Sequence, residues 1–228
     1  MKIDFHSHIL PGCDHGSRHR STSCAQLELA AEAGLDTICA TSHFYPEVRN
    51  VRDYLERRDA SYAALMEYLP KNMRDPEKAP RILLGAEVLI CEGIARLPDL
   101  EKLCLEGTNV LLLEMPFTHW TESHFESVEE LLERKDIRPV IAHADRYQPD
   151  DIDRLLDYEI PLQLNVDSLC SLFMPKQLKS WIEYGHVCAL GSDIHGSDVG
   201  YAPWLKAEKK LKGNFDLIME RTEELIFG

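Results

Sequence analysis

The chain has 228 residues, which fits one large domain or two small ones, and α/β barrels of this length commonly form single domains. Apolar residues make up 44% of the chain and charged residues 28%, as in ordinary folded globular proteins. The formal net charge of −14 argues against a nucleic-acid-binding protein, because contacts to phosphates need clustered lysine and arginine. A phosphorylated substrate stays open, since bound cations would reverse the local charge.

The seven cysteines are scattered and form no Cys-x-x-Cys pair, so zinc-ribbon and thioredoxin-like motifs are absent from the sequence. Several, such as Cys39 and Cys188, stand within apolar runs and are expected to be small buried side chains in a reducing compartment. The first residues resemble a strand rather than a signal peptide, and no run approaches the roughly 18 apolar residues of a membrane span. We therefore expect a cytoplasmic protein.

Short apolar segments alternate with segments of helical period along the chain. Seven strands are predicted, over Lys2–Phe5, Thr37–Thr41, Arg81–Ala86, Asn109–Glu114, Pro139–Ala142, Leu162–Val166 and Val187–Leu190. Helices are predicted after them, over Thr22–Ala33, Val51–Leu69, Asp99–Leu105, Ser123–Arg134, Asp150–Leu156, Lys176–Tyr184, Ala202–Lys212 and Phe215–Leu225. The polar stretch Pro70–Pro80 is predicted to be a surface loop.

This alternation indicates an α/β fold. Continuous apolar runs such as Val110–Leu113 fit a parallel sheet that is covered on both faces. Seven strand–helix units favour a closed or nearly closed barrel in one domain over residues 1–228. The sequence has no glycine-rich dinucleotide motif and no Walker motif, so neither nucleotide-binding class has support.

Histidines and carboxylates stand at the end of nearly every predicted strand. His6 and His8 are two residues apart, so they point to the same face of the first strand. In a β/α barrel such strand ends meet at one mouth, where the active site forms. The candidate metal ligands are His6, His8, Asp14, His43, Glu87, Glu114, His143, Asp193 and His195. The sixth strand adds Asn165 and Asp167.

A glutamate at the tip of an apolar strand is costly to bury unless it is paired or bound to a metal. The four carboxylates in this set would also repel one another in a low dielectric. Two or three divalent metals would resolve the repulsion. Mixed imidazole and carboxylate ligands suit Zn, Mn or Fe better than Mg or Ca.

These motifs resemble those of PHP-domain (polymerase and histidinol phosphatase) metallophosphoesterases. Within that superfamily the chain is most similar to the CpsB/YwqE-type manganese-dependent bacterial protein tyrosine phosphatases. The matching motifs are Asp4-Phe-His-Ser-His-Ile-Leu-Pro-Gly-Cys-Asp-His-Gly16, Ala40-Thr-Ser-His43, Gly85-Ala-Glu87, Leu113-Glu114-Met-Pro, Pro139-Val-Ile-Ala-His-Ala-Asp-Arg-Tyr147, Leu164-Asn-Val-Asp-Ser168 and Gly191-Ser-Asp-Ile-His195.

The resemblance implies a distorted (β/α)7 barrel of the PHP superfamily that holds three divalent metal ions, with Mn expected and Fe or Zn as alternatives. One metal would be held by His6, His8, Glu87 and Asp193. Asp14, His43 and His195 would hold the second, and Glu87 would bridge to a third with Glu114 and His143.

The implied activity is a protein tyrosine phosphatase, in which a metal-activated hydroxide attacks phosphorus and the catalytic residues are Asp14, Glu87 and Arg146. Its substrate would be a phosphotyrosine protein, for example a bacterial tyrosine kinase with a tyrosine-rich tail, in the control of capsular polysaccharide or exopolysaccharide synthesis. Two alternatives stay open. One is a small-molecule phosphatase similar to histidinol phosphatase, and the other is a non-catalytic scaffold of a polysaccharide-export assembly.

The chain departs from the family at the phosphate-binding arginines. Arg146 matches one of them, but the region 196–201 after His195 lacks the second arginine that relatives usually carry. Arg18, Arg20 and Arg49 are the candidates to replace it. A cysteine-dependent phosphatase is excluded, because a Cys-x5-Arg motif would require an arginine where His19 follows Cys13.

Overall fold

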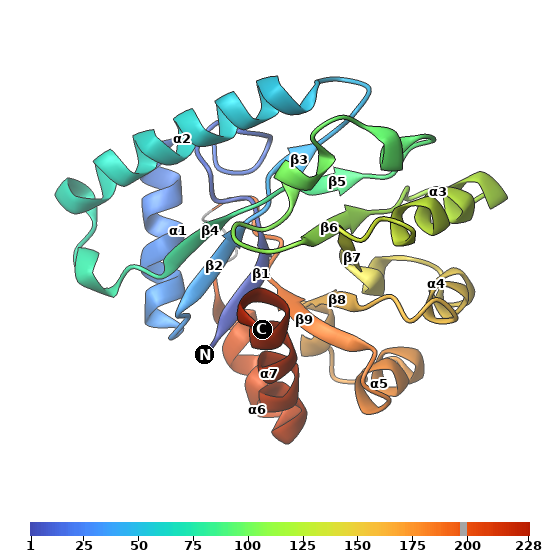
Figure 1. Cartoon of the computed structure of the whole chain (residues 1–228). Helices are drawn as coiled ribbons and strands as arrows, with labels where there is room; N and C mark the ends of the chain where they lie inside the picture. Colours follow the sequence, from blue (N-terminus) through green and yellow to red (C-terminus); the bar gives the residue numbers. More distant parts are fainter. Residues whose placement is uncertain (197–199) are drawn as a thin grey trace.

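The computed structural model describes residues 1–196 and 200–228. Within them the chain forms parallel strands with helices on the outside (Figure 1). The strands are β1 (Ile3–Ser7), β2 (Thr37–Ala40), β3 (His43–Phe44), β4 (Arg81–Leu84), β5 (Glu87–Leu89), β6 (Val110–Glu114), β7 (Arg138–Ile141), β8 (Leu162–Asn165) and β9 (Val187–Gly191). The α/β class expected from the sequence is therefore confirmed.

The strands follow one another in chain order, as in a β/α barrel, but their hydrogen bonds form two sheets. One sheet has the order β1-β2-β4 and the other has the order β3-β5-β6-β7-β8-β9, and every pair is parallel. Ile194, just after β9, pairs with Ser7 at the end of β1, and the Asp193 amide donates to the His6 carbonyl over 2.8 Å. The last strand thus lies beside the first, and the barrel is distorted where the two sheets part.

The two sheets separate after β2 and after β4. Each of these strands is followed, a few residues later, by a second short strand, β3 after β2 and β5 after β4. Thr41 and Ser42 follow β2, and both of their carbonyls accept the amide of Glu87. Beyond that point β3 and β5 pair, with His43 in register with Glu87. The sequence pattern predicted one strand in each place and missed these two segments, which carry candidate ligands.

The helices agree with the prediction at most positions. They are α1 (Arg20–Glu32), α2 (Val51–Asn72), α3 (Glu122–Leu132), α4 (Pro149–Leu156), α5 (Lys176–Glu183), α6 (Ala202–Leu211) and α7 (Gly213–Phe227). The helix predicted over Asp99–Leu105 is wrong, because only a 3-10 turn forms there, η3 (Leu100–Leu103), after Asp99 in a left-handed conformation with φ 63°. The loop predicted from Pro70 begins later, since Pro70 lies in the last turn of α2.

The core consists of strand side chains covered by the helices. A large buried cluster fills the space between strands and outer helices, and a smaller one joins strand residues such as Phe5 and Leu112 to Leu225 and Ile226 of α7. All seven cysteines are free, and five of them are buried, as expected. Among the described residues, no helix has both the length and the apolarity that crossing a bilayer requires.

Candidate metal centre

The carboxyl ends of the strands bring eight of the nine predicted ligands to one buried cluster. Three groups of side chains each place one ligand atom per residue within 4.8 Å of the others. The groups are His6, His8 and Asp193; His8, His43 and His195; and His43, Glu87 and Glu114. His143 joins the cluster through its Nε2, which lies 2.8 Å from Glu87 Oε1.

Glu87 lies at the middle of this cluster with a side chain that is 0% exposed. Its Oε2 is 3.3 Å from Nε2 of both His6 and His8, and 2.8 Å from Nδ1 of His43. Burial by itself would raise the pKa of Glu87, but the facing imidazoles, with His6 first, hold that pKa well below its usual range. One carboxylate that touches four imidazoles is the arrangement expected of a ligand that bridges metal ions.

Glu114 shows what the cluster does to a carboxyl group without a cation. Burial, and then the negative charge of Glu87, raise the pKa of Glu114 to about 8. Asp193 shows the opposite effect. Burial alone would raise the pKa of Asp193, but His6, His8 and the Arg146 guanidinium lower it. A divalent cation between Glu87 and Glu114 would remove their repulsion, so the charges of these side chains fit a metal site.

The unpaired polar atoms of the interior point to the same conclusion. Nine buried side-chain nitrogen and oxygen atoms have no partner in hydrogen-bonding geometry among the described residues, and five of them belong to the predicted ligands. Two of the five, on His43 and Glu87, lie 2.8 Å apart as an ion pair that lacks this geometry. These five are His43 Nδ1, Glu87 Oε2, Glu114 Oε2, His143 Nδ1 and His195 Nε2. Since buried polar atoms are rarely left unpaired, their concentration here fits a centre that binds divalent metal ions.

Asp14 lies beside the cluster rather than in any of its three groups. Its Oδ2 accepts from Nδ1 of His8 over 2.7 Å and from the His43 amide over 3.0 Å. Its Oδ1 accepts from the Gly16 amide. In this position Asp14 directs Nε2 of His8 toward the cluster, an orienting contact that metal-binding histidines commonly have. That Asp14 itself binds a metal stays a prediction.

Two of the predicted ligands have left-handed backbone conformations. His143, directly after β7, has φ 32°, and Asp193, after β9, has φ 50°. A positive φ is uncommon for residues other than glycine and is concentrated at functional sites. Here it turns both side chains toward the cluster as each strand ends.

Gln163 on β8 also orients ligands, a role that the sequence pattern does not reveal. Its side chain is buried, and its Oε1 accepts from the His143 amide over 2.7 Å and lies 3.0 Å from His6 Nδ1. Because that oxygen can only accept, His6 must carry its proton on Nδ1, which leaves Nε2 free to bind a metal. Gln163 Nε2 donates to Asn165 Oδ1, and the side-chain Nδ2 of Asn165 donates in turn to Asp193 Oδ2. The sequence gives no signal that Gln163 orients His6 and His143, because this role depends on which strands lie beside β8.

Gly191 makes room for this chain of contacts. A Cβ atom at Gly191 would lie 2.5 Å from the His6 Cβ and 2.8 Å from Gln163 Nε2. Only glycine therefore fits at this position.

Asp167, the other polar residue predicted after the strand that forms β8, does not join the cluster. Its side chain accepts from the backbone amide of Ser168 at the start of the 3-10 turn η5 (Ser168–Cys170).

Arg146 lies at the edge of the cluster with its side chain 43% exposed. Its guanidinium is 2.7 Å from Asp193 Oδ2. The neighbouring Asp145 faces elsewhere and accepts from the Asn165 amide over 2.7 Å. Arg146 therefore presents a partly solvated guanidinium beside the predicted ligands, where an anion bound at the cluster would meet it.

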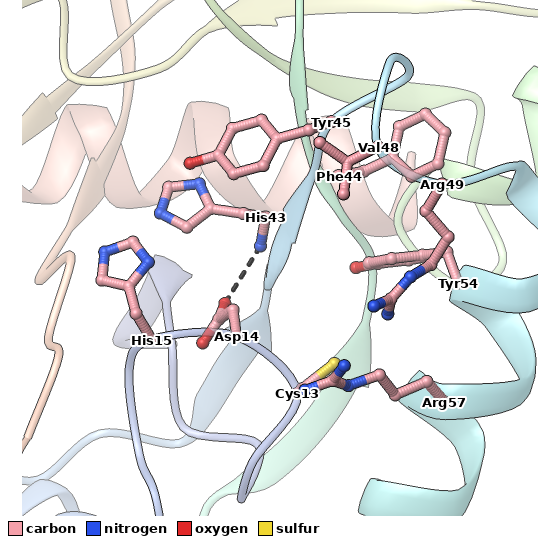
Figure 2. Close-up of a pocket in the computed structure, with 10 residues that line it drawn as sticks. All are labelled: Cys13, Asp14, His15, His43, Phe44, Tyr45, Val48, Arg49, Tyr54 and Arg57. Atoms are coloured by element: carbon pink, nitrogen blue, oxygen red, sulfur yellow. Dashed lines mark hydrogen bonds between the residues drawn. The ribbon is translucent and has the colours of Figure 1, made fainter.

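The other three candidate arginines are divided between two pockets. Arg49 lines a pocket of about 190 Å³ that borders Asp14 and His43, together with Arg57 and Tyr45 (Figure 2). Arg18 and Arg20 line a different pocket, in which Arg20 lies 5.4 Å from the Tyr68 ring centre.

Of these three arginines, only Arg49 shares a pocket with predicted metal ligands. Residues 197–199, in the region that lacks the second family arginine, lie outside the described residues.

Comparisons with known proteins show which proteins this chain resembles in sequence and fold. The chain is 26% identical over 217 residues to the tyrosine-protein phosphatase CpsB of Streptococcus pneumoniae, which covers 86% of this chain and 84% of that protein. A solved structure of the metal-dependent tyrosine phosphatases YwqE from Bacillus subtilis and CpsB from S. pneumoniae matches with a TM-score of 0.79 and 24% identity, covering 98% of this chain and 94% of the other.

The structure described as "putative histidinol phosphatase hisK" from Listeria monocytogenes shares the fold more distantly. Its TM-score is 0.51 and its identity is 14%, covering 88% of this chain and 98% of the other. The family model described as "Capsular polysaccharide synthesis, CpsB/CapC" matches residues 2–216. This protein belongs to the CpsB/CapC family of capsular polysaccharide synthesis proteins.

Proposed function

We propose that this protein is a metal-dependent phosphomonoester hydrolase that removes phosphate from phosphotyrosine in proteins and acts in capsular polysaccharide or exopolysaccharide synthesis. The observation that carries the proposal is the buried cluster around Glu87 with the Arg146 guanidinium at its edge. Metal ions held there supply Lewis-acid activation of water and neutralise phosphoryl charge. The similarity to CpsB and the family membership support tyrosine phosphate as the substrate.

In this proposal the chain's own residues orient the phosphate. The planar guanidinium of Arg146 donates to two phosphoryl oxygens at once, which holds the phosphorus in one orientation. Arg49, across His43 in the neighbouring pocket, supplies the second cation. A phenolate, with a pKa of about 10, is a better leaving group than an alkoxide, so aryl phosphates should react faster than alkyl phosphates.

The proposed cofactors are three divalent ions, with Mn expected and Fe or Zn as alternatives. The three ligand groups overlap at His8 and His43, and they are compatible with that number. The proposed ligand sets are those that the family resemblance implies, with Glu87 as the bridge. The proposed partner is a phosphotyrosine protein such as a tyrosine kinase with a tyrosine-rich tail, in the cytoplasm.

The scaffold alternative has less support. A scaffold needs no buried carboxylates, and Glu87 and Glu114 repel each other in the interior without a cation. Cations bound at the cluster would account for that arrangement, and a scaffold role does not.

The test begins with exhaustive chelation of the purified protein. We expect the metal-free protein to be inactive on a phosphotyrosine peptide and on p-nitrophenyl phosphate, and Mn, Fe, Co or Zn to restore turnover. Histidinol phosphate serves as the small-molecule comparison. Full activity without metal would refute the metal requirement, and a clear preference for histidinol phosphate would favour the small-molecule alternative.

A further inference from the structure

An exposed aromatic side chain stands beside the centre on the loop that follows β6. Phe117 is 63% exposed, and the part of its ring that is covered packs against His143 and Tyr147. Its ring lies 5.5 Å from the ring of His143 with an interplanar angle of 22°, so one face covers a predicted metal ligand. The exposed remainder of the ring is accessible from the mouth of the site.

The backbone on both sides of Phe117 is held in place. The Tyr147 hydroxyl bonds to both the amide and the carbonyl of Met115, each over 2.9 Å. The Trp120 indole donates to the Pro116 carbonyl over 2.8 Å and packs edge-on against Tyr147. The loop is thus anchored before and after Phe117, although the Phe117 ring itself faces solvent.

The surroundings of Phe117 match an aryl phosphate. A pocket of about 310 Å³ is lined by Phe117, Trp120 and Tyr147 together with Arg146. A guanidinium and an aromatic wall are therefore side by side at the edge of the metal centre. In phosphotyrosine, one oxygen separates the phosphorus from a flat ring, so a phosphate held by Arg146 would place its ring at this wall.

We propose that Phe117 is the residue that recognises the aryl group of the substrate, with the phosphotyrosine ring stacked on its exposed face in the pocket that it shares with Arg146. The assignment rests on the proposed function and adds a reason for selectivity between aryl and alkyl phosphates. Offset aromatic stacking stabilises such a pair by about 0.5–1.5 kcal/mol beyond area burial, which corresponds to roughly two- to tenfold in affinity.

The test measures binding to the Mn-loaded protein by calorimetry, with benzylphosphonate as the aryl probe and ethylphosphonate as the alkyl probe. In each the carbon attached to phosphorus replaces the ester oxygen, so neither probe is hydrolysed. We expect Phe117→Ala to weaken benzylphosphonate binding by about three- to tenfold and to leave ethylphosphonate binding and metal content unchanged. Phe117→Tyr should keep the wild-type preference.

Phe173→Ala is the matched control, since Phe173 is also an exposed phenylalanine, at 82% exposure, and lies outside this pocket. It should change neither affinity. Equal weakening of both probes by Phe117→Ala, or a loss of metal, would mean that Phe117 only shields His143, and would overturn the inference. Turnover of a phosphotyrosine peptide by the wild type tests the proposed function separately, because the binding measurements need no catalysis.

Discussion

Arg146 and Asp193 form an ion pair with a nitrogen-to-oxygen distance of 2.7 Å, although 47 positions separate them in the chain. The pair joins a partly exposed cation to a carboxylate that is buried among histidines. Because the guanidinium has five donors, it can keep this contact and still donate to a bound phosphate.

Replacing Arg146 by lysine should lower kcat/KM on p-nitrophenyl phosphate by about tenfold or more, or about 1.4 kcal/mol, because an ammonium cannot make the two-pronged contact. Steady-state kinetics and metal analysis of the same preparations measure this, and metal content should not change. Arg96→Lys is the control, since Arg96 pairs with Glu130 on the surface. Unchanged kinetics with a lowered melting temperature would show that Arg146 is structural.

Replacing Glu87 by glutamine should reduce turnover by roughly 100-fold or more and lower the metal content, with little change in fold. The amide has the same shape but lacks the charge that Glu87 directs at four imidazoles, so metal binding weakens without leaving a cavity. Elemental analysis and circular dichroism measure the two effects. Glu122→Gln, a surface change, should alter neither. If Glu87→Gln retained wild-type activity and metal, Glu87 would not be a bridge.

The sequence predicted most of the cluster because its members lie at strand ends. His6 and His8 could be paired from their spacing, and Glu114 stood out as a charge ending an apolar run. Residues whose role depends on a neighbouring strand gave no such signal. Gln163 looks like any polar residue in a strand until β1 and β7 lie beside it.

The short strands β3 and β5 could not be predicted for a related reason. Each has only two or three residues, which is too few for a periodic pattern. They exist because His43 pairs in register with Glu87 across the two chain segments. The wrongly predicted helix over Asp99–Leu105 shows the limit of apolar spacing. Asp99 is left-handed and Cys104 is extended, with ψ 157°, so only one 3-10 turn fits between them.

Arg49→Ala should raise KM for a phosphotyrosine peptide several-fold with little change in kcat, if Arg49 supplies the second cation. Arg20→Ala removes the same charge from the other pocket and is the control for the overall field of the protein. Kinetics at two ionic strengths separate a local contact from long-range attraction. Equal effects of the two substitutions would remove Arg49 from the proposed site.

Gln163→Leu should weaken metal binding by about 10- to 100-fold, because His6 and the His143 amide lose the acceptor that fixes them. Competition with a chelator of known affinity measures the change directly. Gln163→Glu keeps an acceptor oxygen facing His6 and should retain more affinity than Gln163→Leu. If the Gln163→Leu variant binds metal as tightly as the wild type, Gln163 does not position the ligands.

The stability of the protein should depend on pH through the buried carboxyl group of Asp145. Burial raises the pKa of this carboxyl from 3.8 to about 6, although its acceptor contact with the Asn165 amide partly opposes the shift. Between about pH 4 and pH 6 the folded protein therefore binds more protons at this site than the unfolded chain. The free energy of unfolding consequently falls as the pH rises through that window and levels off above it.

Asp145→Asn removes the charge and keeps the oxygen that accepts from Asn165. The variant should match the wild type near pH 4 and be more stable at pH 8, by an amount on the order of 1–2 kcal/mol once partial solvent exposure is allowed for. Urea unfolding of both proteins with chelator present, at several pH values, measures the difference. Asp136→Asn should behave in the opposite way, because Arg134 lowers the pKa of Asp136 and the wild type gains stability as that carboxyl ionises. A difference between Asp145→Asn and the wild type that did not vary with pH would show that the Asp145 carboxyl is not held protonated by the fold.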